Sequence, residues 1–248
     1  MDGPAARLTS QRSPNTRGAL VAIAVALDFA WVTVHIPALA AIGLVEDDSR
    51  FYLAYQIGRL VVASTACVAA VRSGLFSRRE LGLVGARHVA ALCWLARIVG
   101  VVALVAAVLV GVLALVVPST ACALAWRSLA QTIIGPSGAV LRDLLCMVAV
   151  APLYEELLYR ALMLSSLRDR LGEQPALLMS GGVFVALHYV YGYGWHVAYL
   201  AVALVLGLVF LRSGSIVPSL VLHAVSNLWF VASSYAVGAA ILARLCPA

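Results

Sequence analysis

The chain contains about seven apolar segments that are long enough, or nearly so, to cross a lipid bilayer as helices. This feature limits its folds more than any other, because a spanning helix needs roughly 20 apolar residues. The segments are residues 18–44, 51–72, 88–117, 141–165, 175–191, 194–212 and 215–243, and the last can form one helix or two. We predict an all-α fold, a polytopic transmembrane bundle of about seven to eight helices. Residues 1–17 would form a polar tail and residues 18–248 a single bundle.

Composition agrees with a lipid environment. Of 248 residues, 63% are hydrophobic and only 11% are charged, and the mean hydropathy is +1.00. A soluble domain has about 25% charged residues, so this chain carries too little charge to cover a water-facing surface. The net charge of +6 comes from arginines spread along the connectors, which does not resemble a nucleic-acid-binding surface. The five cysteines form no CxxC pair and no metal-ligand spacing, and we interpret them as structural.

Arginine accumulates in every second connector, and this pattern predicts the orientation in the membrane. The connectors that share this feature contain Arg7, Arg12, Arg17, Arg72, Arg78, Arg79, Arg87, Arg168, Arg170 and Arg212. By the positive-inside rule these connectors and the N-terminus are cytoplasmic. The connector from Pro118 to Gly138 is half apolar and can form an interfacial helix. Because the chain is rich in Ala, Val and Arg and has no Lys, we expect a bacterial inner-membrane protein.

Some ionisable residues inside the segments have a structural explanation. A charged side chain is costly in the bilayer unless it is paired. Asp28, Arg59 and Arg97 lie in the first three segments, so we predict a buried Asp–Arg pair among these helices. Three histidines near segment ends are interpreted as interfacial or hydrogen-bonded residues: His35, His88 and His196.

The fourth segment is harder to explain by packing alone. Glu155 and Glu156 are adjacent, and Arg160 follows Glu156 by four residues, which is the favourable order for an ion pair on a helix. Glu155 is rotated by about 100° from Glu156. We therefore interpret Glu156–Arg160 as a structural pair that leaves Glu155 free for chemistry. Pro152 removes a helix hydrogen bond nearby and should loosen the backbone.

Two later segments also place polar residues inside the bilayer. Phe184 precedes His188 by one helical turn, and His223 and Asn227 share a helix face at four-residue spacing. A single intramembrane histidine is often only a helix-packing group. With a rise of about 1.5 Å per residue, however, Glu155 and these residues can share one layer of the bilayer. Three helices that each supply such groups favour a single site.

Three motifs, in this order and on separate segments, form a recognisable set. The motifs are Glu155-Glu156-x-x-x-Arg160, Phe184-x-x-x-His188 and His223-x-x-x-Asn227. The set resembles the pattern of the CAAX protease and bacteriocin-processing family, also called the Abi family, which includes the type II CAAX prenyl endopeptidases. The resemblance covers about residues 140–230.

The resemblance implies an intramembrane endopeptidase whose substrate is a peptide or a membrane protein. Glu155 and His188 would activate the attacking water, and His223 and Asn227 would stabilise the oxyanion. Imidazole and amide donors do this well in a poorly solvated site. The residues implied to support the site are Glu156, Arg160 and Phe184.

Metal dependence and function each leave an alternative. Family members are often labelled metalloproteases, so a divalent metal such as zinc on Glu155, His188 and His223 is one alternative. The HExxH motif is absent, and we favour water activation without a metal. A non-catalytic immunity or scaffold protein is the second alternative to a protease. A transporter or proton relay is less favoured because no paired repeat is visible.

Overall fold

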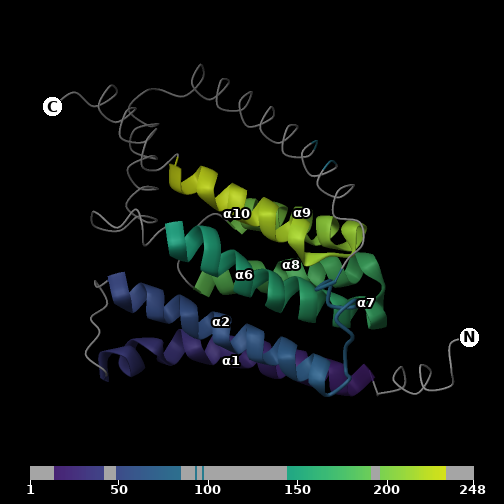
Figure 1. The fold of residues 1–248 in the computed structure, drawn as a ribbon, viewed down its shortest axis with the longest axis horizontal. Coiled ribbons are helices and arrows are strands. Elements are labelled where there is room, and N and C mark those ends of the chain that lie inside the picture. Colours follow the sequence, from purple (N-terminus) through teal and green to yellow (C-terminus); the bar gives the residue numbers. More distant parts are fainter. Residues whose placement is uncertain are drawn as a thin grey trace, which may run out of the picture.

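The computed structural model describes residues 14–41, 49–84, 144–190 and 196–232, together with Cys93 and Arg97. All regular structure in these ranges is helical, as predicted (Figure 1). The helices are α1 (Pro14–Ala41), α2 (Ser49–Arg72), η2 (Leu144–Val150), α6 (Ala151–Glu155), η3 (Glu156–Leu164), α7 (Ser165–Leu171), α8 (Glu173–Val190), α9 (His196–Ser213) and α10 (Ile216–Ala232). The predicted segment 88–117 (apart from Cys93 and Arg97), the connector 118–138 and the end of the last segment lie outside the described residues. A total of seven to eight helices is therefore not established.

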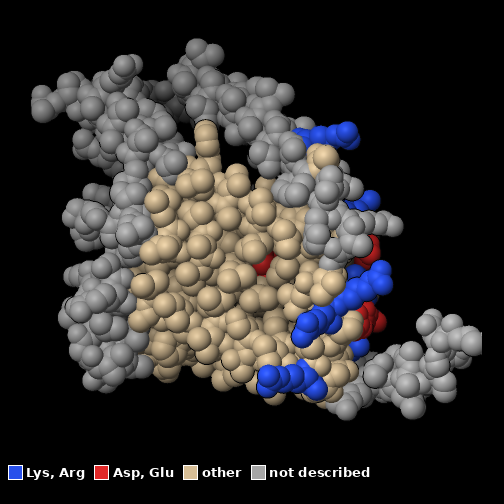
Figure 2. Space-filling view, in the orientation of Figure 1, with Lys and Arg blue, Asp and Glu red and all other residues tan. Residues whose placement is uncertain are grey.

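The helices that coincide with the predicted apolar segments are apolar on their outer faces. Two stretches, Asn15–His35 in α1 and Tyr52–Arg72 in α2, are long and apolar enough to cross a membrane. Large apolar side chains are exposed on several helices, including Val61 at 57%, Leu178 at 60% and Trp229 at 71%. Figure 2 shows a largely uncharged surface on which the charged side chains gather toward one end, apart from an acidic side chain visible near the middle of the face. Such a surface suits lipid along its length and water at the charged end.

The run from Leu144 to Leu171 forms the central helix of the bundle. It packs against α1 and α2 on one side and against α8, α9 and α10 on the other (Figure 1). Leu158 and Leu162 are completely buried and Tyr159 is almost so, within the main apolar core. Any polar side chain on this helix is therefore far from bulk water unless it lies near an end.

Glu155 and Glu156 lie where the central helix changes its winding. The α-helical turn α6 is preceded and followed by the π-helical stretches η2 and η3. Pro152 lies at the start of α6 but inside the continuous central helix, where its ring nitrogen has no hydrogen to donate to the preceding turn. Glu155 is the last residue of the α-helical turn and Glu156 the first of η3. π-Helical turns are uncommon and frequently mark functional sites.

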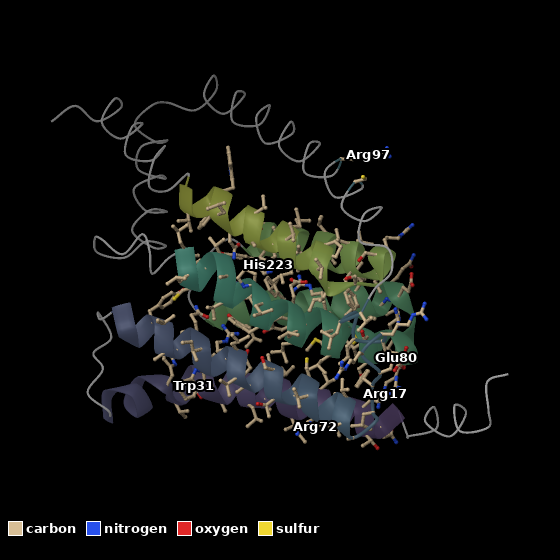
Figure 3. All side chains as sticks on the ribbon, in the orientation of Figure 1. Arg17, Trp31, Arg72, Glu80, Arg97 and His223 are labelled. Atoms are coloured by element: carbon tan, nitrogen blue, oxygen red, sulfur yellow. The ribbon has the colours of Figure 1, made fainter. Side chains whose placement is uncertain are left out.

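Connectors predicted to share one side of the membrane do lie together. Arg17 forms ion pairs with Glu80 at 3.0 Å and with Asp169 at 2.7 Å, at the charged end (Figure 3). The N–H of Ile216, at the start of α10, donates to the carbonyl of Gly82 at 3.0 Å. Gly82 has a φ of +67°, and a Cβ there would press on the backbone of α10. Four chain segments thus meet at one end; that this end is cytoplasmic stays a prediction.

The predicted buried Asp–Arg pair is present between α1 and α2. The guanidinium of Arg59 donates to both carboxylate oxygens of Asp28, each at 2.7 Å, and the two side chains are 3% and 1% exposed. Arg97 is exposed and lies apart from this hairpin (Figure 3). His35 contacts the carbonyl of Val32 at 2.6 Å, as expected for a hydrogen-bonded histidine. The side chains of His88 and His196 are outside the described residues.

Candidate catalytic site

Three helices bring the predicted site residues to the centre of the bundle. The central helix provides Glu155, Glu156 and Arg160, α8 provides Phe184 and His188, and α10 provides His223 and Asn227. The two glutamates, Arg160, Phe184 and His223 are buried, and His188 and Asn227 are partly buried. His223 lies inside the bundle between α10 and the central helix (Figure 3).

His223 joins the two glutamates. Its Nδ1 lies 3.0 Å from Oε1 of Glu156, and its Nε2 lies 3.5 Å from Oε2 of Glu155. The other oxygen of Glu155, Oε1, accepts a hydrogen bond from the hydroxyl of Tyr154 at 2.8 Å. Arg160 NH1 lies 3.2 Å from Glu156 Oε1, which is the predicted ion pair. Glu155 has no part in this ion pair, and its two oxygens contact Tyr154 and His223 instead.

The contacts of His223 determine where its protons lie. A carboxylate can only accept, so Nδ1 carries a hydrogen toward Glu156. The contact of Nε2 with Glu155 is attractive only if one more proton lies between them. Two carboxylates and the guanidinium of Arg160 sum to one negative charge, and one such proton makes the cluster neutral. Neutrality matters here because an unbalanced buried charge is costly.

Aromatic rings fix the imidazole of His188. Its ring lies between those of Phe184 and Tyr199, with centroids 4.2 and 4.6 Å away. Its Nδ1 lies 2.8 Å from the backbone carbonyl of Phe184. A carbonyl only accepts, so Nδ1 carries the hydrogen and, in the neutral ring, Nε2 keeps its lone pair. The carboxylate of Glu155 lies within Coulombic range of this imidazole.

Phe184 forms the wall between the ion-pair cluster and His188. The guanidinium carbon of Arg160 lies 5.0 Å from the centroid of its ring, in a cation–π contact. The ring of His223 approaches the same phenyl group edge-on, with centroids 6.3 Å apart. One apolar side chain therefore contacts the cation and both histidines.

Asn227 forms its hydrogen bond with a group outside the cluster of the other site residues. Its amide Nδ2 donates to the backbone carbonyl of Met147 in η2 at 2.7 Å. It lies one helical turn beyond His223 on the same face of α10. The described structure thus brings Glu155, Glu156, Arg160 and His223 into direct contact and links His188 through Phe184. Asn227 sits at the edge of this cluster.

Several groups at the site carried no role in the sequence analysis. Tyr154 is the hydrogen-bond donor to Glu155, and Tyr199 covers His188. Tyr154 could have been suspected, because a tyrosine beside a buried acid can donate to it. Nothing in the sequence indicates that Tyr199 and the carbonyl of Met147 lie at the site, because their positions depend on how separate helices cross.

The donor set was compared with what a metal ion requires. Among the residues that the structure describes, no three His, Cys, Asp or Glu side chains are grouped so that they could hold a metal ion. Nδ1 of both histidines is engaged, so only Nε2 of each could face a metal ion, and Nε2 of His223 here faces Oε2 of Glu155. Dependence on a metal stays an open prediction.

The comparison with protein families supports the predicted resemblance. Residues 136–229 match the family model described as type II CAAX prenyl endopeptidase Rce1-like. The matched range contains all seven predicted site residues, from Glu155 to Asn227, and less than half of the chain. No curated protein and no solved structure gives a match. The matched family implies a CAAX-type endopeptidase; α1 and α2 lie outside the match.

Proposed function

We propose that this chain is an intramembrane endopeptidase that hydrolyses peptide bonds with a water activated by Glu155. The observation that supports it best is the buried contact between Glu155 Oε2 and His223 Nε2. Oε1 is held by Tyr154, so Oε2 is the oxygen that can accept a proton from water. The range matched by the CAAX-type endopeptidase family includes both residues.

Glu155 acts as the general base, and His188 orients the water. Nε2 of His188 has a lone pair because Nδ1 is held by the carbonyl of Phe184. The water oxygen bonds to the carbonyl carbon of the substrate while one water proton passes to Glu155. That proton then moves to the amide nitrogen as the C–N bond breaks. The products are a carboxyl group and an amine, so atoms and protons balance.

His223 and Asn227 stabilise the oxyanion. When the extra proton of the cluster lies on His223, its Nε2–H is a donor beside Glu155, which stays anionic and keeps its role as base. The amide of Asn227 donates one N–H to the carbonyl of Met147, and its second N–H is the donor to the oxyanion. Glu156 and Arg160 hold His223 in place through Nδ1.

The substrate is a peptide or a membrane-associated protein, and it enters from the charged end of the bundle. The site lies on the central helix, which begins to leave the apolar core at α7, next to the charged ion pairs of Arg17. The apolar outer faces of α1 and α2 contact the lipid of a bacterial inner membrane. Nucleic acid has no part in this function.

A Glu155→Gln variant tests the proposal. The purified chain in lipid nanodiscs is incubated with a peptide library in H₂¹⁸O, and mass spectrometry detects new termini. Hydrolysis places one ¹⁸O in each new C-terminal carboxylate. Glu155→Gln should lower this labelling about 10²- to 10⁴-fold. Glu173 is an exposed acid at the start of α8, and the control Glu173→Gln should keep the labelling. Normal labelling by Glu155→Gln would refute the mechanism.

The same assay separates the alternatives. A strain that carries Glu155→Gln should accumulate uncut membrane proteins relative to wild type. If its biological activity is intact at normal expression, the chain is a scaffold and not a protease. Full activity after chelation and metal removal would exclude an essential metal ion, and loss restored by zinc would contradict our metal-free mechanism.

A further inference from the structure

A chain of contacts runs from the α1–α2 hairpin to the carboxylate proposed as general base. It begins at the Asp28–Arg59 ion pair, which has two hydrogen bonds of 2.7 Å. The guanidinium carbon of Arg59 lies 4.2 Å from the centroid of the Tyr154 ring. The hydroxyl of Tyr154 donates to Oε1 of Glu155 at 2.8 Å. The four residues are each 5% exposed or less.

We infer that Arg59, held by Asp28, is a positioning residue for Glu155 and acts through Tyr154. This inference rests on the proposed function of Glu155 as the base. It extends the site beyond residues 136–229, because Asp28 and Arg59 lie on α1 and α2.

The hydrogen bond from Tyr154 fixes the orientation of the Glu155 carboxylate. Rotation about the last bond of a glutamate side chain is broad. The Tyr154 hydroxyl holds Oε1, so the carboxylate plane is fixed with Oε2 toward His223 at 3.5 Å. Without this bond the plane could turn, and the proton acceptor would lose its fixed position.

Arg59 in turn holds the ring that carries this hydroxyl. The cation faces the electron-rich face of the Tyr154 ring, an interaction that is stronger in a dry environment. Both hydrogen bonds to Asp28 prevent the guanidinium from turning away. The position of the phenol thus depends on a residue pair from two other helices.

Packing of α1 on α2 does not by itself require this ion pair. An apolar pair of similar volume fills the same space without the desolvation cost of two buried ions. What an apolar pair does not provide is a cation over the Tyr154 ring. The close contact with the Tyr154 ring at 4.2 Å, beside a longer one with the Tyr55 ring at 5.8 Å, is what the ion pair adds to this packing.

The test combines two sets of substitutions. Tyr154→Phe removes the hydroxyl and keeps the ring. Asp28→Leu with Arg59→Met removes the cation without leaving an unpaired charge. Tyr52→Phe, a tyrosine of α2 outside this chain of contacts, is the control. Melting temperatures verify that each variant is folded.

We expect Tyr154→Phe and Asp28→Leu/Arg59→Met each to lower kcat about 10- to 100-fold with little change in KM, because the base is misplaced. The variant that combines all three substitutions should lose no more kcat than the more strongly impaired of these two variants. The reason is that both sets of substitutions act on the same hydrogen bond, from Tyr154 to Glu155. Independent losses that multiply, or wild-type kcat in Asp28→Leu/Arg59→Met, would overturn the inference.

A second readout does not depend on proteolysis. The infrared band of the Glu155 carboxyl group, assigned from the difference between wild type and Glu155→Gln, reports its hydrogen bonding. It should shift alike in Tyr154→Phe and in Asp28→Leu/Arg59→Met, and not in Tyr52→Phe. An unshifted band in the ion-pair variant overturns the inference. Shifted bands together with full cleavage by Glu155→Gln would keep the positioning and refute only the proposed function.

Discussion

Replacing Arg160 by Met should destabilise the fold strongly, because it strands a carboxylate that water cannot reach. Glu156 is 0% exposed and Arg160 2% exposed, and their ion pair measures 3.2 Å. Removing one partner of such a pair costs about 3–5 kcal/mol of unfolding free energy. Arg160 also donates a hydrogen bond to the carbonyl of Ala203, but at 3.4 Å this bond is long and adds little to the cost of the substitution. Nδ1 of His223 remains beside Glu156 and compensates only in part.

The matched variant is Glu156→Gln with Arg160→Met, in which no buried charge is stranded. Gln at position 156 can still accept from Nδ1 of His223, so the double variant should recover at least about 2 kcal/mol of the loss. Both variants are unfolded with SDS in mixed micelles, and helicity is followed by circular dichroism. A single variant as stable as wild type would refute the reasoning. A double variant as unstable as the single one would show that Arg160 stabilises through Phe184 instead.

Three further outcomes follow from the described contacts. Gly58→Ala should cost about 1–3 kcal/mol in the same unfolding assay, because its Cβ would lie 2.5 Å from the indole of Trp31. A Cβ at Gly182 would meet nothing within 4 Å beyond its chain neighbours and its own helix backbone. Gly182→Ala should therefore gain up to about 1 kcal/mol. Asn227→Ala should lower kcat by about 10²- to 10³-fold if its amide serves the oxyanion, and unchanged kcat would remove that role. Burial by itself raises the pKa of the Glu80 carboxyl. The N–H and hydroxyl of Ser77 and the Arg17 guanidinium lower this pKa by more than burial raises it, so it lies below the ordinary 4.5. A lowered pKa stabilises the fold above that pH, so wild type should lose its advantage over Glu80→Gln as pH falls below about 4.5, and a constant difference would contradict this.

The contacts within one helix could be predicted from the sequence. Helical spacing places Glu156 and Arg160 on one face, and they do form an ion pair. The buried Asp28–Arg59 pair followed from the cost of an isolated charge, although only helix packing decides between Arg59 and Arg97. Shared depth in the bilayer was sufficient to expect that His223 and the glutamates lie together.

Contacts that depend on how particular helices cross, and irregular turns, could not be predicted. Tyr199 covers His188 and Asn227 binds the carbonyl of Met147 because of how α8, α9, α10 and η2 cross. Spacing along one chain segment carries no information on such crossings. Propensity also does not distinguish π-helical from α-helical turns, so Pro152 predicted a loosened backbone nearby but not the change of winding at Glu156. The second partner of Glu155, the hydroxyl of Tyr154, was missed although the two residues are adjacent.

The Asp28–Arg59 pair also bears on how the protein is made. Its members are 31 residues apart, on two helices that are synthesised before the central helix. An unpaired Asp or Arg at the middle of a spanning helix costs about 2.5–3.5 kcal/mol during insertion. The α1–α2 hairpin can instead enter the membrane as a neutral unit before the central helix is synthesised. The charged turn around Glu155, Glu156 and Arg160 then inserts beside a finished hairpin whose cation is already in place for Tyr154.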